Sequence, residues 1–246
     1  MDKQQIKALR LDKYLADMQV GTRSQIKEMV RKGRVTVDDK IVKSSDVKVI
    51  PGQNAICVDG RTVGYAHMEY YMLNKPAGVV SATEDNNCKT VLDCIDGKLR
   101  KDLFPVGRLD KDTEGLLLIT NDGDLAHALL SPKKHVEKCY YAKLDGAIDD
   151  AMVKVLEDGV DLGEFVAMPA KVKILSTSDE ESEVEIIIME GKFHQVKRMF
   201  EAVGRTVTYL KRLSMGPLVL DESLALGGYR ELTETELDAL KAHGNK

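Results

Sequence analysis

The chain has 246 residues, of which 43% are hydrophobic and 31% are charged, with 36 Lys and Arg against 40 Asp and Glu. This composition is typical of an ordinary globular protein that has enough apolar side chains for a large core. No apolar run approaches the roughly 20 residues of a membrane-spanning helix, and the polar start of the chain lacks the apolar segment of a secretory signal. We therefore expect a cytoplasmic protein without a membrane partner.

The charge is divided unevenly along the chain. Residues 1–67 carry 13 Lys and Arg against 8 Asp and Glu, a net charge of +5, whereas the remaining residues carry −9. The apolar spacing over residues 11–18 predicts a helix, and Thr22 with Gln25 forms a capping box that predicts a second helix to about Lys32. A small hairpin is expected over residues 35–42.

Basic side chains gather on the second predicted helix. Arg23, Lys27 and Arg31 recur every four residues and form one stripe, and Lys32 and Arg34 follow at its end. Such a stripe can be an ordinary solvated helix face. The positive charge of the segment instead favours a surface that meets a polyanion.

Three short motifs of this segment match a known module: Arg10-Leu11-Asp12, Gly21-Thr22-Arg23-Ser24 and Gly33-Arg34-Val35-Thr36-Val37. Residues 8–58 resemble the RNA-binding module named after ribosomal small-subunit protein four, although Asp38-Asp39 replaces the usual Asn-Gly turn. The resemblance implies RNA contacts by Arg10, Lys13, Arg23, Lys27, Arg31, Lys32 and Arg34. We expect this module over residues 1–59, a linker over 60–67 and a catalytic domain over 68–246.

The rest of the chain mixes predicted strands and helices without regular alternation. Strands are expected near 69–74, 116–119, 137–144, 172–175, 183–189 and 207–213, and helices near 90–95, 125–129, 149–156, 193–203 and from Thr233 onward. This order favours an α+β fold over a doubly wound parallel sheet.

One stretch, Gly107 to Thr120, places a charged turn directly before four consecutive apolar residues, Leu116 to Ile119. A run this short and this tightly bounded predicts a strand buried on both faces. Asp110 then lies at the rim of the core, where a carboxylate loses some hydration and stays open to a ligand. On local sequence alone the acidic residues could simply form a turn. We expect Asp112 and Glu114 to face solvent.

The sequence offers little for other kinds of chemistry. The four cysteines contain no Cys-x-x-Cys pair and no zinc-like spacing. Cys139 is a weak candidate for a nucleophile, because it falls in a predicted strand with only His135 nearby. There is no Gly-x-Gly-x-x-Gly fingerprint and no phosphate-cradling loop. We expect neither a metal nor a cofactor.

Four further segments occur in the order of one family: Asn74-Lys75-Pro76-Ala77-Gly78; Gly107-Arg108-Leu109-Asp110 with Thr113 and Gly115-Leu116-Leu117; Glu137-Lys138-Cys139-Tyr140; and Glu190 to Phe200. The chain resembles a bacterial ribosomal RNA pseudouridine synthase, closest to the small-subunit enzyme. The resemblance implies a mostly antiparallel mixed sheet and makes Asp110 the catalytic aspartate. Tyr140 is expected to pack against the uracil.

The resemblance also suggests the charged residues around the aspartate. Lys197 is expected to pair with Asp110 and keep it ionised, with Arg198 as the alternative partner. Arg108 and Arg198 are the expected substrate contacts. The aspartate would either attack the anomeric carbon of the ribose or remove a neighbouring ribose proton, and neither route needs a cofactor.

The predicted substrate is one uridine of 16S rRNA, met in the free RNA or in a small-subunit assembly intermediate, by a protein that acts as a monomer. The segment His194 to Phe200 is more similar to the small-subunit enzyme than to the Arg-richer large-subunit enzymes. The alternatives are a synthase that acts on 23S rRNA, a non-catalytic RNA-binding assembly factor, and an RNA methyltransferase that carries the same small module.

Overall fold

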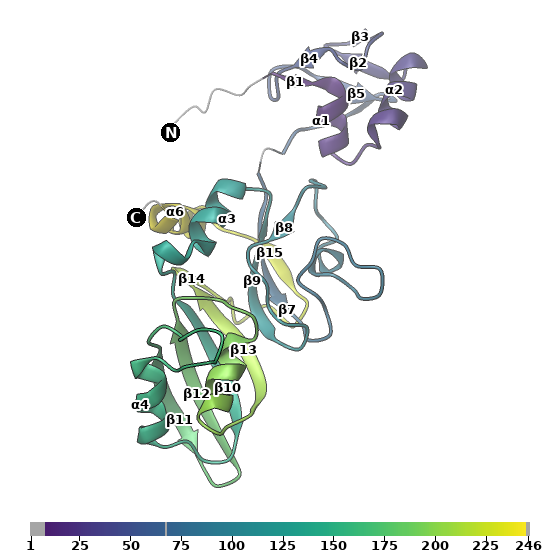
Figure 1. Ribbon diagram of the computed structural model, residues 1–246. Helices are drawn as coiled ribbons and strands as arrows, with labels where there is room; N and C mark the ends of the chain where they lie inside the picture. The colour runs from purple at the N-terminus through teal and green to yellow at the C-terminus, as the bar shows by residue number, and fades with distance from the viewer. Residues whose placement is uncertain (1–7, 67, 245–246) are drawn as a thin grey trace. The chain divides into compact units, whose positions relative to one another are not determined.

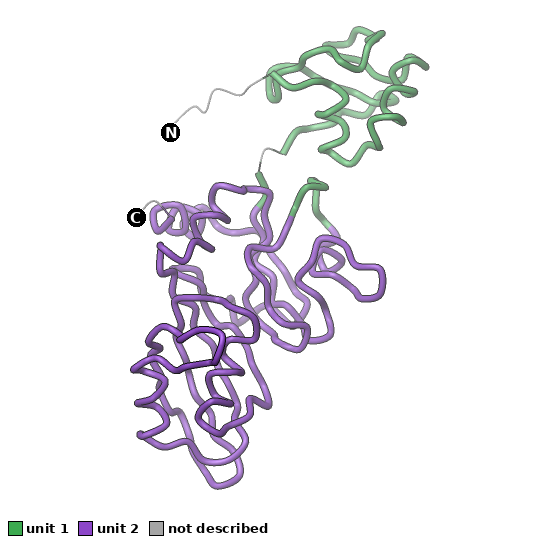
Figure 2. Tube along the Cα trace, viewed as in Figure 1, with its two compact units in different colours: residues 1–69, 97–103 green, residues 70–96, 104–246 purple. Residues whose placement is uncertain are grey.

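The computed structural model describes residues 8–66 and 68–244, and it divides into two compact units (Figure 2). The first unit comprises residues 1–69 together with residues 97–103, and the second comprises residues 70–96 and 104–246. None of the described helices has the length and apolar character needed to cross a membrane.

The N-terminal unit packs two helices on small sheets. Its elements are α1 (Leu11–Asp17), α2 (Arg23–Arg31), a sheet with the order β3 (Lys40–Ile41), β2 (Val35–Val37), β5 (Ile56–Val58) and β6 (Arg61–Thr62), and the pair β1 (Leu9–Arg10) and β4 (Lys48–Val49). The predicted capping box is confirmed: Thr22 Oγ1 accepts from the amide of Gln25 at 3.3 Å, and Gln25 Oε1 accepts from the amide of Thr22 at 2.8 Å. Leu11, Leu15 and Ile26 are fully buried in the core between these elements.

This unit extends beyond the segment 1–59 that the sequence predicts for it. Within the predicted linker, β6 pairs with β5, and the ring of Tyr65 lies 4.8 Å from that of Tyr14. The carboxylate of Glu69 accepts the amides of Leu99 and Arg100 at 3.0 and 2.8 Å, which ties the segment 97–103 to the same unit.

The larger unit is built on a nine-stranded sheet whose main path runs β11-β12-β10-β13-β9-β7-β15, with β14 beside β13 and β8 beside β9 (Figure 1). The strands are β7 (Tyr70–Lys75), β8 (Phe104–Pro105), β9 (Glu114–Thr120), β10 (Lys138–Asp145), β11 (Lys171–Thr177), β12 (Glu181–Ile188), β13 (Val207–Met215), β14 (Leu218–Val219) and β15 (Tyr229–Glu231). All strand pairs in it are antiparallel except β9 with β13. The expected α+β fold with a mostly antiparallel mixed sheet is confirmed.

Helices cover this sheet in places. They are α3 (Gly123–Leu130), α4 (Asp150–Asp158), α5 (Gln195–Ala202) and α6 (Glu234–Gly244), with 3-10 turns η1 (Val91–Cys94) and η2 (Pro132–Lys134). α3 packs against α6, α4 against β11 and α5 against β13 (Figure 1). Where the sequence predicts a helix over 90–95, the structure has only the single 3-10 turn η1.

Strand β9 fixes the position of the candidate site. Its residues Leu116 to Ile119 are fully buried, so the predicted burial on both faces is confirmed. Gly115 is the second residue of β9; its φ of +98° favours glycine, and an added Cβ would lie 2.3 Å from the carbonyl oxygen of Arg212 on β13. The loop that carries Asp110 therefore runs directly into a strand that is closely joined to its neighbour.

Candidate active site

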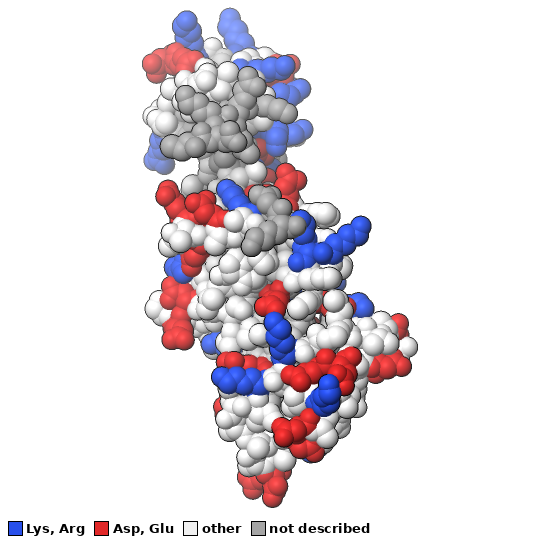
Figure 3. Space-filling model, turned by 90° about the vertical axis from the view of Figure 1, so that its left-hand side faces the viewer, with Lys and Arg blue, Asp and Glu red and all other residues white. Residues whose placement is uncertain are grey.

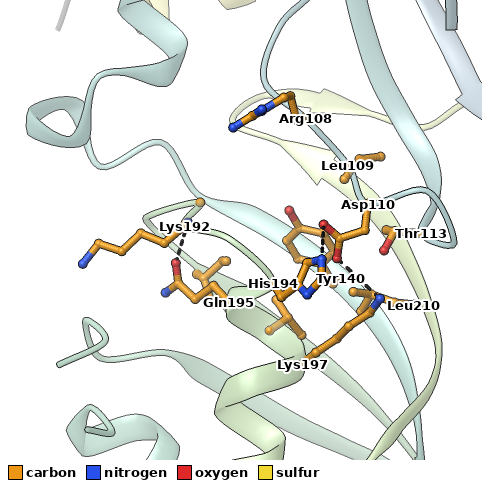
Figure 4. Close-up of a pocket in the computed structure, with 13 residues that line it drawn as sticks. Arg108, Leu109, Asp110, Thr113, Tyr140, Lys192, His194, Gln195, Lys197 and Leu210 are labelled. Atoms are coloured by element: carbon orange, nitrogen blue, oxygen red, sulfur yellow. Dashed lines mark hydrogen bonds and ion pairs between the residues drawn. The ribbon is translucent and has the colours of Figure 1, made fainter. Parts of the chain in front are cut away.

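Residues far apart in the sequence meet around Asp110. The pocket is lined by Arg108, Leu109, Asp110 and Thr113 from the loop before β9, by Tyr140 and Ile188 from β10 and β12, by Leu210 from β13, and by Gly191, Lys192, His194, Gln195, Val196 and Lys197 at the start of α5 (Figure 4). The side chain of Asp110 is 24% exposed, so its carboxylate is partly desolvated but reachable.

Lys197 is shared between two carboxylates. Its Nζ lies 3.4 Å from Asp110 Oδ2, as expected (Figure 4). It lies closer to Asp112, at 2.7 and 2.8 Å from Oδ1 and Oδ2. The hydrogen bond from Lys197 holds the pKa of Asp112 below its usual value. Asp112 faces solvent as expected, with a side chain that is 73% exposed, and it is also the closer partner of the lysine.

Glu114, unlike Asp112, departs from the expected solvent-facing role. It accepts a hydrogen bond of 2.6 Å from the hydroxyl of Tyr209 on β13, and its side chain is only partly exposed. Burial and this carboxylate raise the pKa of the Tyr209 hydroxyl. The contact ties the start of β9 to β13.

His194 lies near the other oxygen of the same carboxylate, with its Nε2 3.6 Å from Asp110 Oδ1. His194 belongs to a motif named in the sequence analysis, but no role was predicted for it. Its backbone has a φ of +50° and it is the N-cap residue of α5, which begins at Gln195, two residues after the predicted start at 193. Only its place in the motif beside Lys197 could have singled it out.

Tyr140 and Leu210 form the apolar wall of the pocket. Both side chains are buried, and they come from the adjacent strands β10 and β13. A planar ring that entered beside Asp110 would pack against this wall.

Lys75 fixes the loop that carries Asp110 through hydrogen bonds to its backbone. The Lys75 side chain is fully buried, and its Nζ donates to the carbonyl oxygens of Pro76, Lys111 and Thr113 at 3.1, 3.3 and 2.8 Å. Burial lowers the pKa of Lys75 to about 8. Lys75 belongs to a motif named in the sequence analysis, but no role was predicted for it. In the structure its hydrogen bonds fix the turn after Asp110.

Ser81 fixes the loop on the other side of the aspartate. Its hydroxyl donates to the carbonyl of Leu109 at 2.8 Å, and it accepts from the amide of Leu109 at 3.0 Å. The amide of Thr113 donates to the carbonyl of Asp110 at 3.1 Å. The backbone is therefore pinned on both sides of Asp110, which favours a single position of the carboxylate.

Thr113 brings an unusual polar atom to the pocket. Its side chain is almost fully buried, and its Oγ1 has no hydrogen-bond partner among the described residues. A buried hydroxyl without a partner is unfavourable and rare in folded proteins. The hydroxyl is therefore available to a ligand that enters the pocket.

The two arginines named from the sequence lie in different places. Arg108 is exposed and lines both the pocket and a neighbouring groove. Arg198 does not line either: its Nη1 lies 3.1 Å from Glu164 Oε2, and its Nη2 donates to the carbonyl of Leu162 at 2.8 Å. Lys197, not Arg198, is the cation that reaches Asp110, because the two residues point in different directions from α5.

The predicted RNA-binding cations of the N-terminal unit differ in whether they pair with a carboxylate. Arg23, Lys27 and Arg31 on α2 are exposed and make no hydrogen bond or ion pair within the described part of the chain. The other four predicted RNA contacts face nearby carboxylates: Arg10 with Asp12, Lys13 with Asp17, Lys32 with Glu28 and Arg34 with Asp59. Lys and Arg side chains project from this unit in the view of Figure 3.

Two other kinds of site, a metal centre and a nucleophilic cysteine, were also considered. Among the residues that the structure describes, no group of three or more His, Cys, Asp or Glu side chains could hold a metal ion. Burial raises the pKa of the Cys139 thiol, which disfavours the thiolate that a nucleophile needs.

Comparisons with known proteins identify both units. A sequence model described as RNA pseudouridylate synthase matches residues 69–202, and one described as S4 domain matches residues 9–54. The chain is 48% identical to the "Uncharacterized RNA pseudouridine synthase YtzG" of Bacillus subtilis, over 94% of this chain and 98% of that protein. It is 39% identical to ribosomal small subunit pseudouridine synthase A of Salmonella typhimurium, over 93% and 98% of the two chains. It is also 39% identical to ribosomal large subunit pseudouridine synthase B of Bacillus subtilis, over 95% and 96%.

Proposed function

The chain belongs to the RNA pseudouridylate synthase family, and from this premise we propose that it isomerises a uridine of 16S ribosomal RNA to pseudouridine with Asp110 as the catalytic aspartate. The observation that carries the proposal is the position of Asp110, a partly buried carboxylate 3.4 Å from Lys197 on the floor of a pocket walled by Tyr140.

The reaction moves one bond and leaves the atomic composition of the nucleotide unchanged. The bond from the ribose anomeric carbon to the ring nitrogen breaks, the uracil turns, and a bond to its carbon-5 forms, after which the carbon-5 proton moves to the ring nitrogen through solvent. Asp110 can attack the anomeric carbon as a nucleophile, or it can take a neighbouring ribose proton as a base. Both routes need the ionised carboxylate, and the nearby Lys197 stabilises that charge.

The other pocket residues can hold the uracil. A uridine must leave its stack to reach a carboxylate inside a pocket, and the lost stacking has to be replaced there. Tyr140 and Leu210 supply an apolar wall for the uracil, and the Thr113 hydroxyl can pair with a polar atom of the nucleotide. Arg108 at the rim can contact a phosphate.

The N-terminal unit can bind the RNA. The exposed cations Arg23, Lys27 and Arg31 on α2 can bind the phosphate backbone, which gives affinity without reading a sequence. The similarity to small subunit synthase A and the match to the S4 domain support rRNA as the substrate. A large subunit enzyme is equally identical, so 23S rRNA is the alternative substrate.

Replacement of Asp110 by Asn tests the catalytic role. We expect Asp110→Asn to abolish pseudouridine formation and to leave RNA affinity nearly unchanged, because the amide can neither attack nor accept the proton. Asp112→Asn, two residues away on the same loop, is the matched control and should retain turnover. Turnover by purified Asp110→Asn would disprove the assignment.

The substrate is tested by mapping pseudouridine across both ribosomal RNAs from a strain that lacks this protein. We expect one site to disappear from 16S rRNA and to return when the wild-type gene, but not the Asp110→Asn gene, is supplied. Loss of a 23S site would support the alternative substrate. Unchanged maps of both RNAs would overturn the proposal.

A further inference from the structure

Phe193 is the most exposed large hydrophobic side chain of the described residues, at 74%. It does not lie on an isolated stretch of surface. It lines a groove of about 760 Å³ that also contains Asp110, Arg108 and His194. An aromatic ring left open to water beside a candidate catalytic carboxylate calls for a ligand that covers it.

The ring of Phe193 is held in place from one side. The imidazole of His194 stacks on it with centroids 3.7 Å apart and planes 19° from parallel, so the opposite face of Phe193 is the one left open. The flanking backbone is fixed by the buried Gln195, whose Oε1 accepts from the amide of Lys192 at 3.0 Å (Figure 4). A ring restrained in this way loses little conformational entropy when a partner stacks on it.

The surroundings of the ring are basic. Arg108, Lys111 and Lys192 line the same groove, and all three are exposed. Lys192 is close to Glu190 at 3.2 Å, but no hydrogen bond or ion pair of Arg108 occurs within the described residues. Cations beside an open aromatic face are the combination that binds single-stranded nucleic acid, in which phosphates meet the charges and a base meets the ring. An apolar protein partner would not need these charges.

His194 contacts both the carboxylate and the Phe193 ring. Its Nε2 lies 3.6 Å from Asp110, and the Phe193 ring stacks on the same imidazole. We infer that Phe193 is a stacking platform for the base of a nucleotide next to the uridine that occupies the pocket. This inference rests on the proposed function, and it adds a residue that holds the flanking RNA while the target base is turned out.

The inference is tested with a short single-stranded oligouridylate that carries one 2-aminopurine, a base whose fluorescence falls when it stacks. Stacking of a base on an aromatic side chain contributes about 1–3 kcal/mol, so we expect Phe193→Leu to weaken binding roughly 5- to 140-fold and to abolish the quenching. Phe193→Trp should keep both. Phe193→Leu retains an apolar side chain, so the comparison isolates the aromatic face.

Val219→Ala, which trims another exposed apolar residue (63%) outside the groove, is the control for general effects on the surface and should bind as wild type. The circular dichroism spectrum and melting temperature of Phe193→Leu should match wild type, because the side chain is exposed. Equal binding and quenching by Phe193→Leu and wild type would overturn the inference, and so would a lack of quenching by wild type.

Failure of this inference is separable from failure of the proposed function. Asp110→Asn should quench 2-aminopurine as wild type does, because stacking precedes the chemistry. If wild type forms pseudouridine while Phe193→Leu binds the probe normally, only the stacking role is wrong. If wild type quenches the probe but forms no pseudouridine in ribosomal RNA, the proposed function is wrong and the groove still binds single-stranded RNA.

Discussion

Replacement of Lys197 by Met removes the nearest cation of Asp110 among the described residues and keeps most of the side-chain volume. Two unit charges 3.4 Å apart, the distance from Lys197 Nζ to Asp110 Oδ2, attract by about 5 kcal/mol at an effective dielectric constant of ~20 and by about 1 kcal/mol in bulk water. The pair is partly buried and Asp112 shares the lysine, so the value falls between these limits. We expect Lys197→Met to lower kcat/KM roughly 10- to 1,000-fold.

The assay is single-turnover release of tritium from RNA that carries uridine labelled at carbon-5, measured from pH 6 to pH 9. The loss should appear at every pH of this range, because the variant lacks the cation that attracts the Asp110 carboxylate. Lys197→Arg keeps the charge and should retain activity within about tenfold.

Asp112→Asn is the control for this experiment. It removes the closer partner of Lys197 and leaves the cation to Asp110, and an ion pair as exposed as this one contributes less than about 1 kcal/mol. We expect little change in rate. Wild-type rates for Lys197→Met across the pH range would refute the charge argument. Equal losses in Lys197→Met and Asp112→Asn would assign the effect to the shape of the loop instead.

Three further changes probe the support of the site. Thr113→Val should leave the free energy of unfolding equal or higher, because the unpartnered buried hydroxyl is gone. The same change should lower kcat/KM roughly 2- to 10-fold in the tritium-release assay. Thr113→Ser, which keeps the hydroxyl, should restore the rate. Gly115→Ala should lower the free energy of unfolding by more than about 1 kcal/mol in denaturant titration, and wild-type stability would contradict the 2.3 Å approach to Arg212. Burial lowers the native pKa of Lys138 from 10.5 to about 8, so the unfolded chain binds more protons between these values and stability rises with pH. Wild type should therefore gain up to about 3 kcal/mol over Lys138→Met across that window, and a constant difference would show that Lys138 does not titrate there.

Periodicity predicts the long elements of this fold and misses the short ones. The buried apolar run Leu116 to Ile119 of β9 and the capping box of α2 were readable from the sequence, because each depends on neighbours along the chain. β8, β14 and β15 have only two or three residues, too few to show an alternation. Their pairing is decided by contacts with strands elsewhere in the chain.

The same distinction applies to the site. Motif order was enough to name Asp110, Tyr140 and Lys197, which the pocket brings together. The hydrogen bond from Lys197 to Asp112 joins residues 85 positions apart, and no local pattern predicts it. Lys197 and Arg198 are neighbours on a helix and diverge by about 100°, so their roles could be separated only once the orientation of α5 was known.

The segment 97–103 gives the two units an unusual covalent relationship. The chain leaves the N-terminal unit after residue 69, returns to it at residue 97, and leaves again after residue 103. Arg100 bonds within that unit to Asp102, and Leu103 is buried. A single cut cannot separate the units cleanly, since a chain that starts at residue 70 would still carry a piece of the RNA-binding unit without its packing partners. Gene rearrangement that loses or exchanges the N-terminal unit would therefore have to rebuild this loop as well, which favours inheritance of the two units as one piece.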